Sequence, residues 1–178
     1  MGTLVEMLSA PMTITAISNS ALSTTDISTP SQSTTLKVQL LSPGAKAPTV
    51  AHPGEDLGYD VYACEDVAIA PRGNAIVATG IAIELICDSG RGMGALLRDK
   101  SSLAARRLTL TGGVIDAGYR GEVRVLIENL GDAPAQIRAG DKIANLIPYP
   151  VLTGSVEVAE ELSGTRRKAG GFGSSGSR

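Results

Sequence analysis

Short runs of β-branched and aliphatic residues, separated by glycine, proline and aspartate, recur along the chain from Leu36 onward. Runs of this length are shorter than ordinary helices, and the turn residues between them stop each run from extending. Residues 121–129 (GEVRVLIEN) begin with alternation and end apolar, as in a strand buried on one face and then on both. Many short strands with regular turns predict an all-β sandwich, jelly roll or barrel.

The same pattern gives an expected layout. We expect one helical turn at residues 101–106 and strands at residues 36–41, 59–63, 66–69, 75–86 with a break near Gly80, 94–98, 107–111, 121–128, 134–138, 143–149 and 155–159. The Ser/Thr-rich composition of residues 1–35 predicts a disordered leader. A single domain at 36–162 follows it, and residues 163–178 have the composition of a flexible C-terminal arm.

Composition restricts both the core and the partners. The 178 residues include 16 basic and 18 acidic side chains, and this net charge of −2 argues against a nucleic-acid binder, which needs a broad basic face. No run approaches the roughly 18 apolar residues of a membrane helix, and the N-terminal segment lacks the basic residues of a signal peptide. The expectation is therefore a soluble cytoplasmic protein without nucleic-acid or membrane partners.

Aromatic residues are scarce, with four Tyr, one Phe and no Trp, so the core is expected to be aliphatic. The single Phe172 lies near the C-terminus among glycines and serines, where it cannot serve a core. Cys64 and Cys87 have no C-x-x-C spacing, and His52 is the only histidine. The ligand count excludes a zinc site and argues against a Cys–His nucleophile pair.

Two segments place polar side chains where strands or helices are expected to start. Asp60, in residues 58–63 (GYDVYA), interrupts an otherwise half-buried strand, where a carboxylate needs a partner or a metal. The alternative is an aspartate in a strand-opening turn. Lys100, Ser101 and Ser102 begin the expected helical turn and offer a cation, two hydroxyls and backbone N–H groups to a phosphate. The alternative there is an ordinary serine N-cap.

A third segment, residues 112–121 (GGVIDAGYRG), leads from apolar residues to Asp116, a glycine turn, Tyr119 and Arg120. A hairpin of this type can present backbone groups to a flat base edge and a ring to a sugar. The alternative is a simple β-hairpin whose aspartate starts the turn.

The fourth and fifth segments lie toward the C-terminus. Residues 140–148 (GDKIANLIP) contain Asn145 and by themselves indicate only a turn and a strand. Residues 166–176 (RRKAGGFGSSG) surround Phe172 with basic residues, glycines and hydroxyls, which can cradle a triphosphate while the ring stacks on a base. A Gly/Ser linker is the alternative, although linkers rarely carry Arg-Arg-Lys with a single Phe.

In order and spacing, the five segments resemble the five motifs of the trimeric dUTP pyrophosphatases (dUTPases), from about Lys37 to Ser177. The resemblance implies a distorted jelly-roll (β-clip) subunit in a homotrimer whose three active sites are shared between chains. In that family one subunit gives motifs one, two and four, a neighbour gives the third, and the fifth is a C-terminal arm. The implied reaction is Mg²⁺-dependent hydrolysis of dUTP to dUMP and pyrophosphate by water attack on the α-phosphorus. It limits uracil incorporation into DNA and supplies dUMP for dTMP synthesis.

The resemblance also implies roles by position. Asp116 orients or deprotonates the attacking water, Tyr119 packs on the deoxyribose, and Asp60 holds Mg²⁺ through water. The backbone of the hairpin reads the uracil edge and leaves no room for a thymine methyl; the residues are Gly113, Val114 and Ile115. The remaining implied substrate contacts are Lys100, Ser101, Ser102, Asn145, Arg167, Phe172, Gly173, Ser174 and Ser175, with Phe172 stacked on the uracil.

Three positions depart from the commonest pattern of the family. The second motif, usually Pro-Arg-Ser-Gly/Ser, here has Lys100 for arginine, which keeps the charge but loses the bidentate fork. The usual glutamine of the fourth motif is Asn145, one methylene shorter. The usual glycine after the arginine of the arm is Lys168.

Two other functions are compatible with parts of this pattern. A dCTP deaminase shares the fold and much of the third motif, but its chemistry needs a carboxylate in the strand after the hairpin. The matching position is Leu126, with Glu128 two residues further on. A non-catalytic nucleotide-binding or regulatory jelly roll is the second alternative, and such a protein is expected to have lost Asp116 or Phe172.

Overall fold

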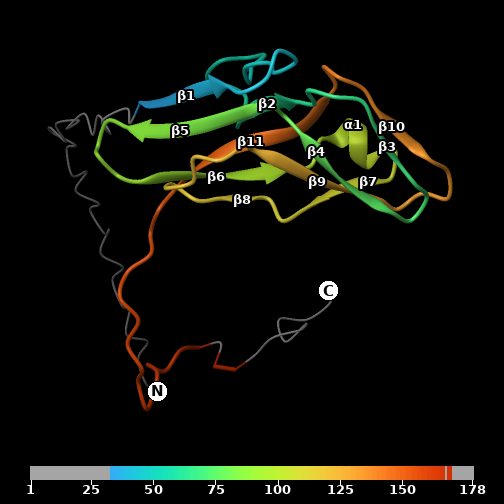
Figure 1. Ribbon diagram of the computed structural model, residues 1–178. Helices are drawn as coiled ribbons and strands as arrows, with labels where there is room; N and C mark the ends of the chain where they lie inside the picture. The colour runs from blue at the N-terminus through green and yellow to red at the C-terminus, as the bar shows by residue number, and fades with distance from the viewer. Residues whose placement is uncertain (1–32, 167, 170–178) are drawn as a thin grey trace, which may run out of the picture. The chain divides into compact units, whose positions relative to one another are not determined.

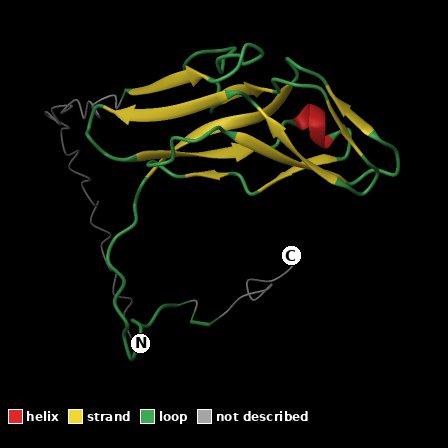
Figure 2. Cartoon of the chain, viewed as in Figure 1, coloured by secondary structure: helices red, strands yellow, loops and turns green. Residues whose placement is uncertain are grey.

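The computed structural model describes residues 33–166, 168 and 169, and within them the chain forms eleven strands and one short helix (Figures 1 and 2). The elements are β1 (Thr34–Leu40), β2 (Tyr59–Tyr62), β3 (Val67–Ile69), β4 (Asn74–Ala78), β5 (Ile81–Cys87), β6 (Met93–Arg98), α1 (Ser101–Ala104), β7 (Leu108–Thr111), β8 (Val114–Ile115), β9 (Arg124–Asn129), β10 (Ala135–Ile137) and β11 (Lys142–Pro150). No helix in this part of the chain is long and apolar enough to cross a membrane.

The strands form three antiparallel sheets. The largest has the order β1-β5-β6-β11-β2, with β8 paired to β6 at its side. Strands β4, β9 and β7 make a second sheet, and β10 pairs with β3. Figure 1 shows β3, β10 and α1 gathered at one end of the fold, while β5 runs toward the other end and β6 runs back from it. Strand β11 lies between β6 and β2 and pairs with both of them.

The core between the sheets is aliphatic, as the composition predicts. In β9, the buried Val125 and Ile127 alternate with more exposed neighbours, which is the expected period of two. Each fully buried side chain of this size stabilises the fold by about 1.5–3 kcal/mol. The largest fully buried hydrophobic side chains are Ile69, Ile81, Leu108, Ile127, Ile137, Ile143, Leu146, Val61, Val77, Val123 and Val125. Tyr62 is the one aromatic residue in the core of the described chain.

Most expected strands are present within a few residues of their predicted ends, including the break at Gly80 between β4 and β5. The expected helical turn is present but shorter, as α1. The strand predicted at 155–159 is wrong, because that segment has no strand in the structure and its Val156 and Val158 are 93% and 97% exposed. Alternating sequence alone does not make a strand, since its backbone needs a neighbouring strand to pair with.

Candidate functional site in two separate pockets

Strand β11 brings three of the predicted site residues together. Its Asn145 lies opposite Asp60 of β2 on one side and opposite Arg98, the last residue of β6, on the other. Lys100 follows two residues later as the N-cap of α1. The ends of β2, β6 and β11 therefore place a carboxylate, an amide and an ammonium group at the same point of the sheet.

Asp60 contacts two lysine side chains there. The Lys100 Nζ contacts Asp60 Oδ1 and lies 3.4 Å from Asn145 Oδ1, and the Lys142 Nζ lies 2.6 Å from Asp60 Oδ2. Burial by itself raises the pKa of Asp60, but the hydrogen bonds from Lys100 and Lys142 outweigh it and hold the pKa below its ordinary value. The same contact raises the pKa of Lys142. Asp60 is thus an ionised carboxylate with partners, as the sequence predicts for a charge in a buried strand.

A pocket of about 330 Å³ opens beside this cluster. Its far wall is the loop before β2, where Asp56 Oδ2 accepts the backbone N–H groups of Ala51 and His52 at 3.1 and 2.9 Å. Ser101 and Ser102 are exposed next to Lys100 but do not line it. The lining residues are Ala51, His52, Asp56, Leu57, Gly58, Asp60, Lys100, Asn145 and Ile147. We call it the lysine pocket.

The third segment forms a tight hairpin against β6. Val114 and Ile115 pair with Leu96 and Ala95, and the Leu97 N–H donates to the Gly113 carbonyl at 2.7 Å. This packing needs glycine on the facing strand, because a Cβ on Gly94 would lie 2.6 Å from the Ile115 carbonyl oxygen. The hairpin is therefore held against the sheet by backbone contacts.

Beyond β8 the chain turns at Asp116, whose carbonyl accepts the Tyr119 N–H at 3.0 Å. The Tyr119 hydroxyl donates to the Glu122 carbonyl at 3.0 Å, and its ring lies directly over Gly121, where a Cβ would meet the ring carbons. Asp116 and Tyr119 both remain exposed. The turn thus fixes the backbone while it leaves a carboxylate and an aromatic face open to a ligand.

A second pocket, of about 600 Å³, opens along this hairpin, and we call it the hairpin pocket. It is lined by Gly94, Ala95, Leu96, Val114, Ile115, Asp116, Ala117, Tyr149, Pro150, Val151, Leu152 and Thr153. It shares no residue with the lysine pocket. On β11, Asn145 lines the lysine pocket and Tyr149 lines the hairpin pocket. The two residues are four positions apart, or about 13 Å at about 3.3 Å per residue of strand.

The structure therefore unites Asp60, Lys100 and Asn145 but does not bring Asp116 to them within one chain. Five predicted contacts, namely Arg167, Phe172, Gly173, Ser174 and Ser175, lie outside the described residues. The sequence reasoning missed Lys142 as a partner of Asp60. The signal available was a lysine immediately before the apolar run of the fourth segment.

The fold and the two pockets define a jelly-roll protein of the dUTPase type. The dUTPase family model matches residues 44–176, and the chain belongs to this family. This confirms both the predicted jelly-roll fold class and the resemblance on which the site residues were placed.

Relatives in several bacteria are named deoxyuridine 5'-triphosphate nucleotidohydrolase. The protein of Clostridium tetani is 39% identical over 145 residues, which are 80% of this chain and 97% of the relative. That of Nocardia farcinica is 44% identical over 146 residues, covering 79% and 85%. A Mycobacterium tuberculosis protein is 42% identical over 153 residues, covering 81% and 96%.

Solved structures give the same result. A dUTPase variant from Staphylococcus bacteriophage 80alpha, solved with dUpNHpp, superposes with a TM-score of 0.72 at 30% identity and covers 80% of this chain and 98% of its own. A variant dUTPase of phage phi11 of S. aureus, described with a structural Mg(II) ion, has a TM-score of 0.65 at 29% identity, covering 73% and 99%.

Proposed function

We propose that this chain hydrolyses dUTP to dUMP and pyrophosphate. The observation that carries the proposal is the hairpin at residues 113–121 in a chain of the dUTPase family. Its exposed carboxylate lines a pocket, and the same turn carries an exposed ring. The relatives named above carry the name of this activity.

The base is the part of the substrate that β8 fits. On one side β8 pairs with β6, and no other described strand pairs with its free edge. The backbone groups along such an edge are available to the flat hydrogen-bonding edge of uracil, as in the binding of an added strand. In this proposal the backbone of Gly113, Val114 and Ile115 reads the base, and the Tyr119 ring covers the deoxyribose.

The triphosphate fits the lysine pocket. Lys100 lines this pocket, and Lys142, which is outside its lining, binds the same carboxylate of Asp60. Asp56 adds a second carboxylate to the wall, so Lys100 is the cationic group that the pocket itself offers. Phosphate oxygens attract such ammonium groups. The amide oxygen of Asn145 accepts from Lys100 Nζ at 3.4 Å, and its NH2 group is the donor that it can offer to a phosphate. We place Ser101 and Ser102 at the rim of the pocket, and Arg167 with the hydroxyls of Ser174 and Ser175 on the outer phosphates.

Mg²⁺ is the cofactor that the resemblance implies, with Asp60 as its carboxylate. Both oxygens of Asp60 are engaged by lysines, and the described residues hold no group of three or more His, Cys, Asp or Glu placed around a metal. Mg²⁺ keeps several waters and takes phosphate oxygens, so one carboxylate and the substrate suffice. These residues fit an ion that arrives with the nucleotide and neutralises charge on its phosphates.

Separate pockets require more than one chain for a complete site. We propose a homotrimer in which the hairpin pocket of one subunit faces the lysine pocket of another. Residues 163–178 then close over the substrate as an arm, with Phe172 stacked on the uracil. Such a lid excludes bulk water and completes the site.

Within that assembly, Asp116 accepts a proton from water as the water oxygen bonds to the α-phosphorus. The bond from the α-phosphorus to the bridging oxygen breaks, and pyrophosphate leaves. This reaction needs alignment and charge neutralisation more than covalent help from the protein. An exposed carboxylate on a backbone-fixed turn meets that need.

The test offers dUTP, dCTP, dTTP and UTP with Mg²⁺ and follows pyrophosphate and ammonia separately. Pyrophosphate from dUTP alone is the expected result. Ammonia from dCTP would mean a deaminase, and no turnover of any nucleotide would mean a binding protein. Leu126, at the position where a deaminase needs its carboxylate, is an apolar residue of β9 paired with Ile76 and Thr111.

A further inference from the structure

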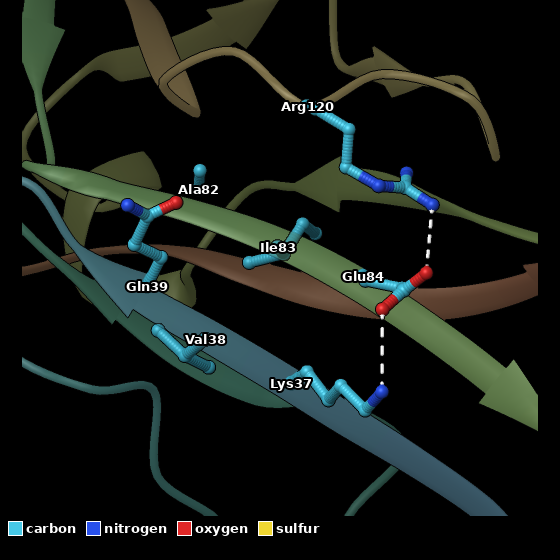
Figure 3. A pocket seen from close by; sticks show the side chains of 7 residues that line it. All are labelled: Lys37, Val38, Gln39, Ala82, Ile83, Glu84 and Arg120. Atoms are coloured by element: carbon cyan, nitrogen blue, oxygen red, sulfur yellow. Dashed lines mark hydrogen bonds and ion pairs between the residues drawn. The ribbon is translucent and has the colours of Figure 1, made fainter.

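Arg120 ties the turn that carries Asp116 to a strand outside all five motifs. Its Nη1 donates to the carbonyl oxygens of Ala117 and Tyr119 at 2.8 and 2.9 Å. Its Nη2 donates to Glu84 Oε1 at 3.0 Å, a contact visible in Figure 3. One guanidinium thus fixes two backbone carbonyls on either side of Gly118 and is itself held by a carboxylate.

Glu84 is well placed to hold that guanidinium still. It lies in the middle of β5, directly opposite Lys37 in the continuous seven-residue ladder between β1 and β5. Its second oxygen, Oε2, lies 3.5 Å from Lys37 Nζ, so Figure 3 shows the carboxylate bridged between two cations. A shallow pocket of about 220 Å³ surrounds this chain of charges.

The hairpin also packs closely on β5 and β6 beneath this bridge. A crevice of only about 10 Å³ remains there, and Asp116, Ala117 and Arg120 line it together with Ile83 and other residues of the two strands. On this side the turn is in close contact with the sheet. The two carbonyl contacts of Arg120 oppose rotation of the 117–119 backbone.

We propose that Glu84 is a positioning residue for Asp116 and Tyr119, acting through Arg120. The inference rests on the proposed hydrolysis of dUTP, because only then does the aim of the Asp116 carboxylate set a rate. Exposed ion pairs add little to global stability, and the side chains of Glu84 and Arg120 are 39% and 52% exposed. A small displacement of a catalytic group, by contrast, lowers turnover strongly. The pair acts on geometry more than on folding.

The experiment compares Glu84→Gln, Arg120→Lys and the double variant with the wild type. Glutamine keeps an acceptor of the same shape but removes the charge, and lysine cannot bond two carbonyls and a carboxylate with one planar fork. The matched control is Asp132→Asn, which removes the carboxylate of the Arg72–Asp132 pair without touching the hairpin. The readouts are kcat, KM, the Kd of dUpNHpp, the thermal midpoint, and hydrogen exchange of peptides covering 113–123.

For Glu84→Gln we expect kcat to fall about fivefold and hydrogen exchange at 113–123 to speed up, with the thermal midpoint and the exchange elsewhere unchanged. The double variant should be no slower than the slower single variant, because both substitutions break one unit. The control should match the wild type in every readout.

Unchanged kcat and unchanged exchange in Glu84→Gln overturn the positioning role, as does a fully additive double variant. If the wild type itself does not hydrolyse dUTP, the proposed function fails, and the exchange measurement still decides whether Glu84 holds the turn.

Discussion

Asp60 and Lys100 are 40 residues apart in the sequence, yet the ammonium group of Lys100 contacts the carboxylate of Asp60 beside the amide of Asn145. Lys142 binds the other carboxylate oxygen at 2.6 Å, so the cluster carries one net positive charge. In a chain with a net charge of −2, two lysines thus meet at one carboxylate, and Lys100 lines the pocket beside it. The ammonium group of Lys100 is the group of this pocket that suits a phosphate oxygen.

Asp116→Asn should remove the general base and leave the hairpin in place. We expect kcat for dUTP to fall by about 10²–10⁴-fold, the usual contribution of such a base. The Kd of dUpNHpp, measured by calorimetry, should stay within about threefold of the wild type. Near-normal turnover would show that another group takes the proton.

Lys100→Met should weaken substrate binding, because it removes the half-buried ammonium group and keeps the length of the side chain. A charge-assisted hydrogen bond contributes about 1.5–3 kcal/mol, so the Kd of dUpNHpp should rise about 10- to 100-fold. Lys142 still pairs with Asp60, and we expect the fold to survive. The control is Lys46→Met, since the Lys46 ammonium lies over the Tyr62 ring and lines no pocket described above. Equal Kd values for the two variants would contradict the role of Lys100.

Gly94→Ala should push the hairpin away from the sheet. The new Cβ would lie 2.6 Å from the Ile115 carbonyl oxygen and 3.3 Å from the Ala117 nitrogen, both of them backbone atoms. We expect at least a tenfold loss of kcat/KM in a protein that still folds, since about 1 Å of misplacement can lower turnover by 10²-fold. Gly154→Ala is the matched control, because nothing lies within 4 Å of a Cβ there. Two variants of equal activity would disprove the close-approach argument.

Glu122 predicts an acid dependence of stability. Burial raises the pKa of its carboxyl, but the hydrogen bonds from Arg124 and the Gly80 N–H prevail and hold the pKa below the ordinary value of 4.5. Between 4.5 and that lower value the unfolded chain binds more protons, so stability falls as the pH drops through this window. Glu122→Gln should therefore have a smaller free energy of unfolding than the wild type at pH 7. On acidification, its free energy of unfolding should fall by less than that of the wild type.

Urea unfolding of both proteins at pH 7 and at pH 4, at fixed protein concentration, measures this difference. Glu157→Gln serves as the control, since Glu157 is exposed in a segment without secondary structure. A gap between wild type and Glu122→Gln that stays constant with pH would rule out the assigned shift.

Deletion of residues 165–178 should separate assembly from catalysis. The described residues of this segment add no strand or helix, so we expect a folded trimer by light scattering and an unchanged thermal midpoint. Activity should fall about 100-fold or more, because the arm completes the site. A truncated chain that fails to assemble would make the arm structural.

The sequence predicts most of the strands because each carries its own period and its own turns. The charged partners are different in kind. Lys142 reaches Asp60 only through the register between β2 and β11, and Glu84 reaches Arg120 only because β5 lies beside the hairpin. The sequence shows a lysine before the apolar run of the fourth segment, but it does not show which carboxylate that lysine meets, because pairings between distant segments are set by the folded sheet. For the same reason the segment 155–159 has strand-like alternation but lacks a strand to pair with in the described chain.

The site residues were predicted as a set because five segments matched a family pattern, while each alone had an ordinary structural alternative. Asp60 illustrates the difference. Its position in a buried strand predicts that it has partners, and the structure confirms this. Only the family resemblance predicted that the motifs are divided between subunits. The chemistry of the individual residues gave no reason to expect two separate pockets.

The placement of Asp116 and Lys100 in different pockets affects how damage combines in a mixed assembly. In the proposed trimer, a chain that lacks both residues spoils two sites, because each of its pockets belongs to a different one. When one chain lacks Asp116 and another lacks Lys100, both losses can affect the same site, and the other two sites then stay intact. A variant impaired at Asp116 and a variant impaired at Lys100, mixed during assembly, should then yield intact sites that neither variant forms alone.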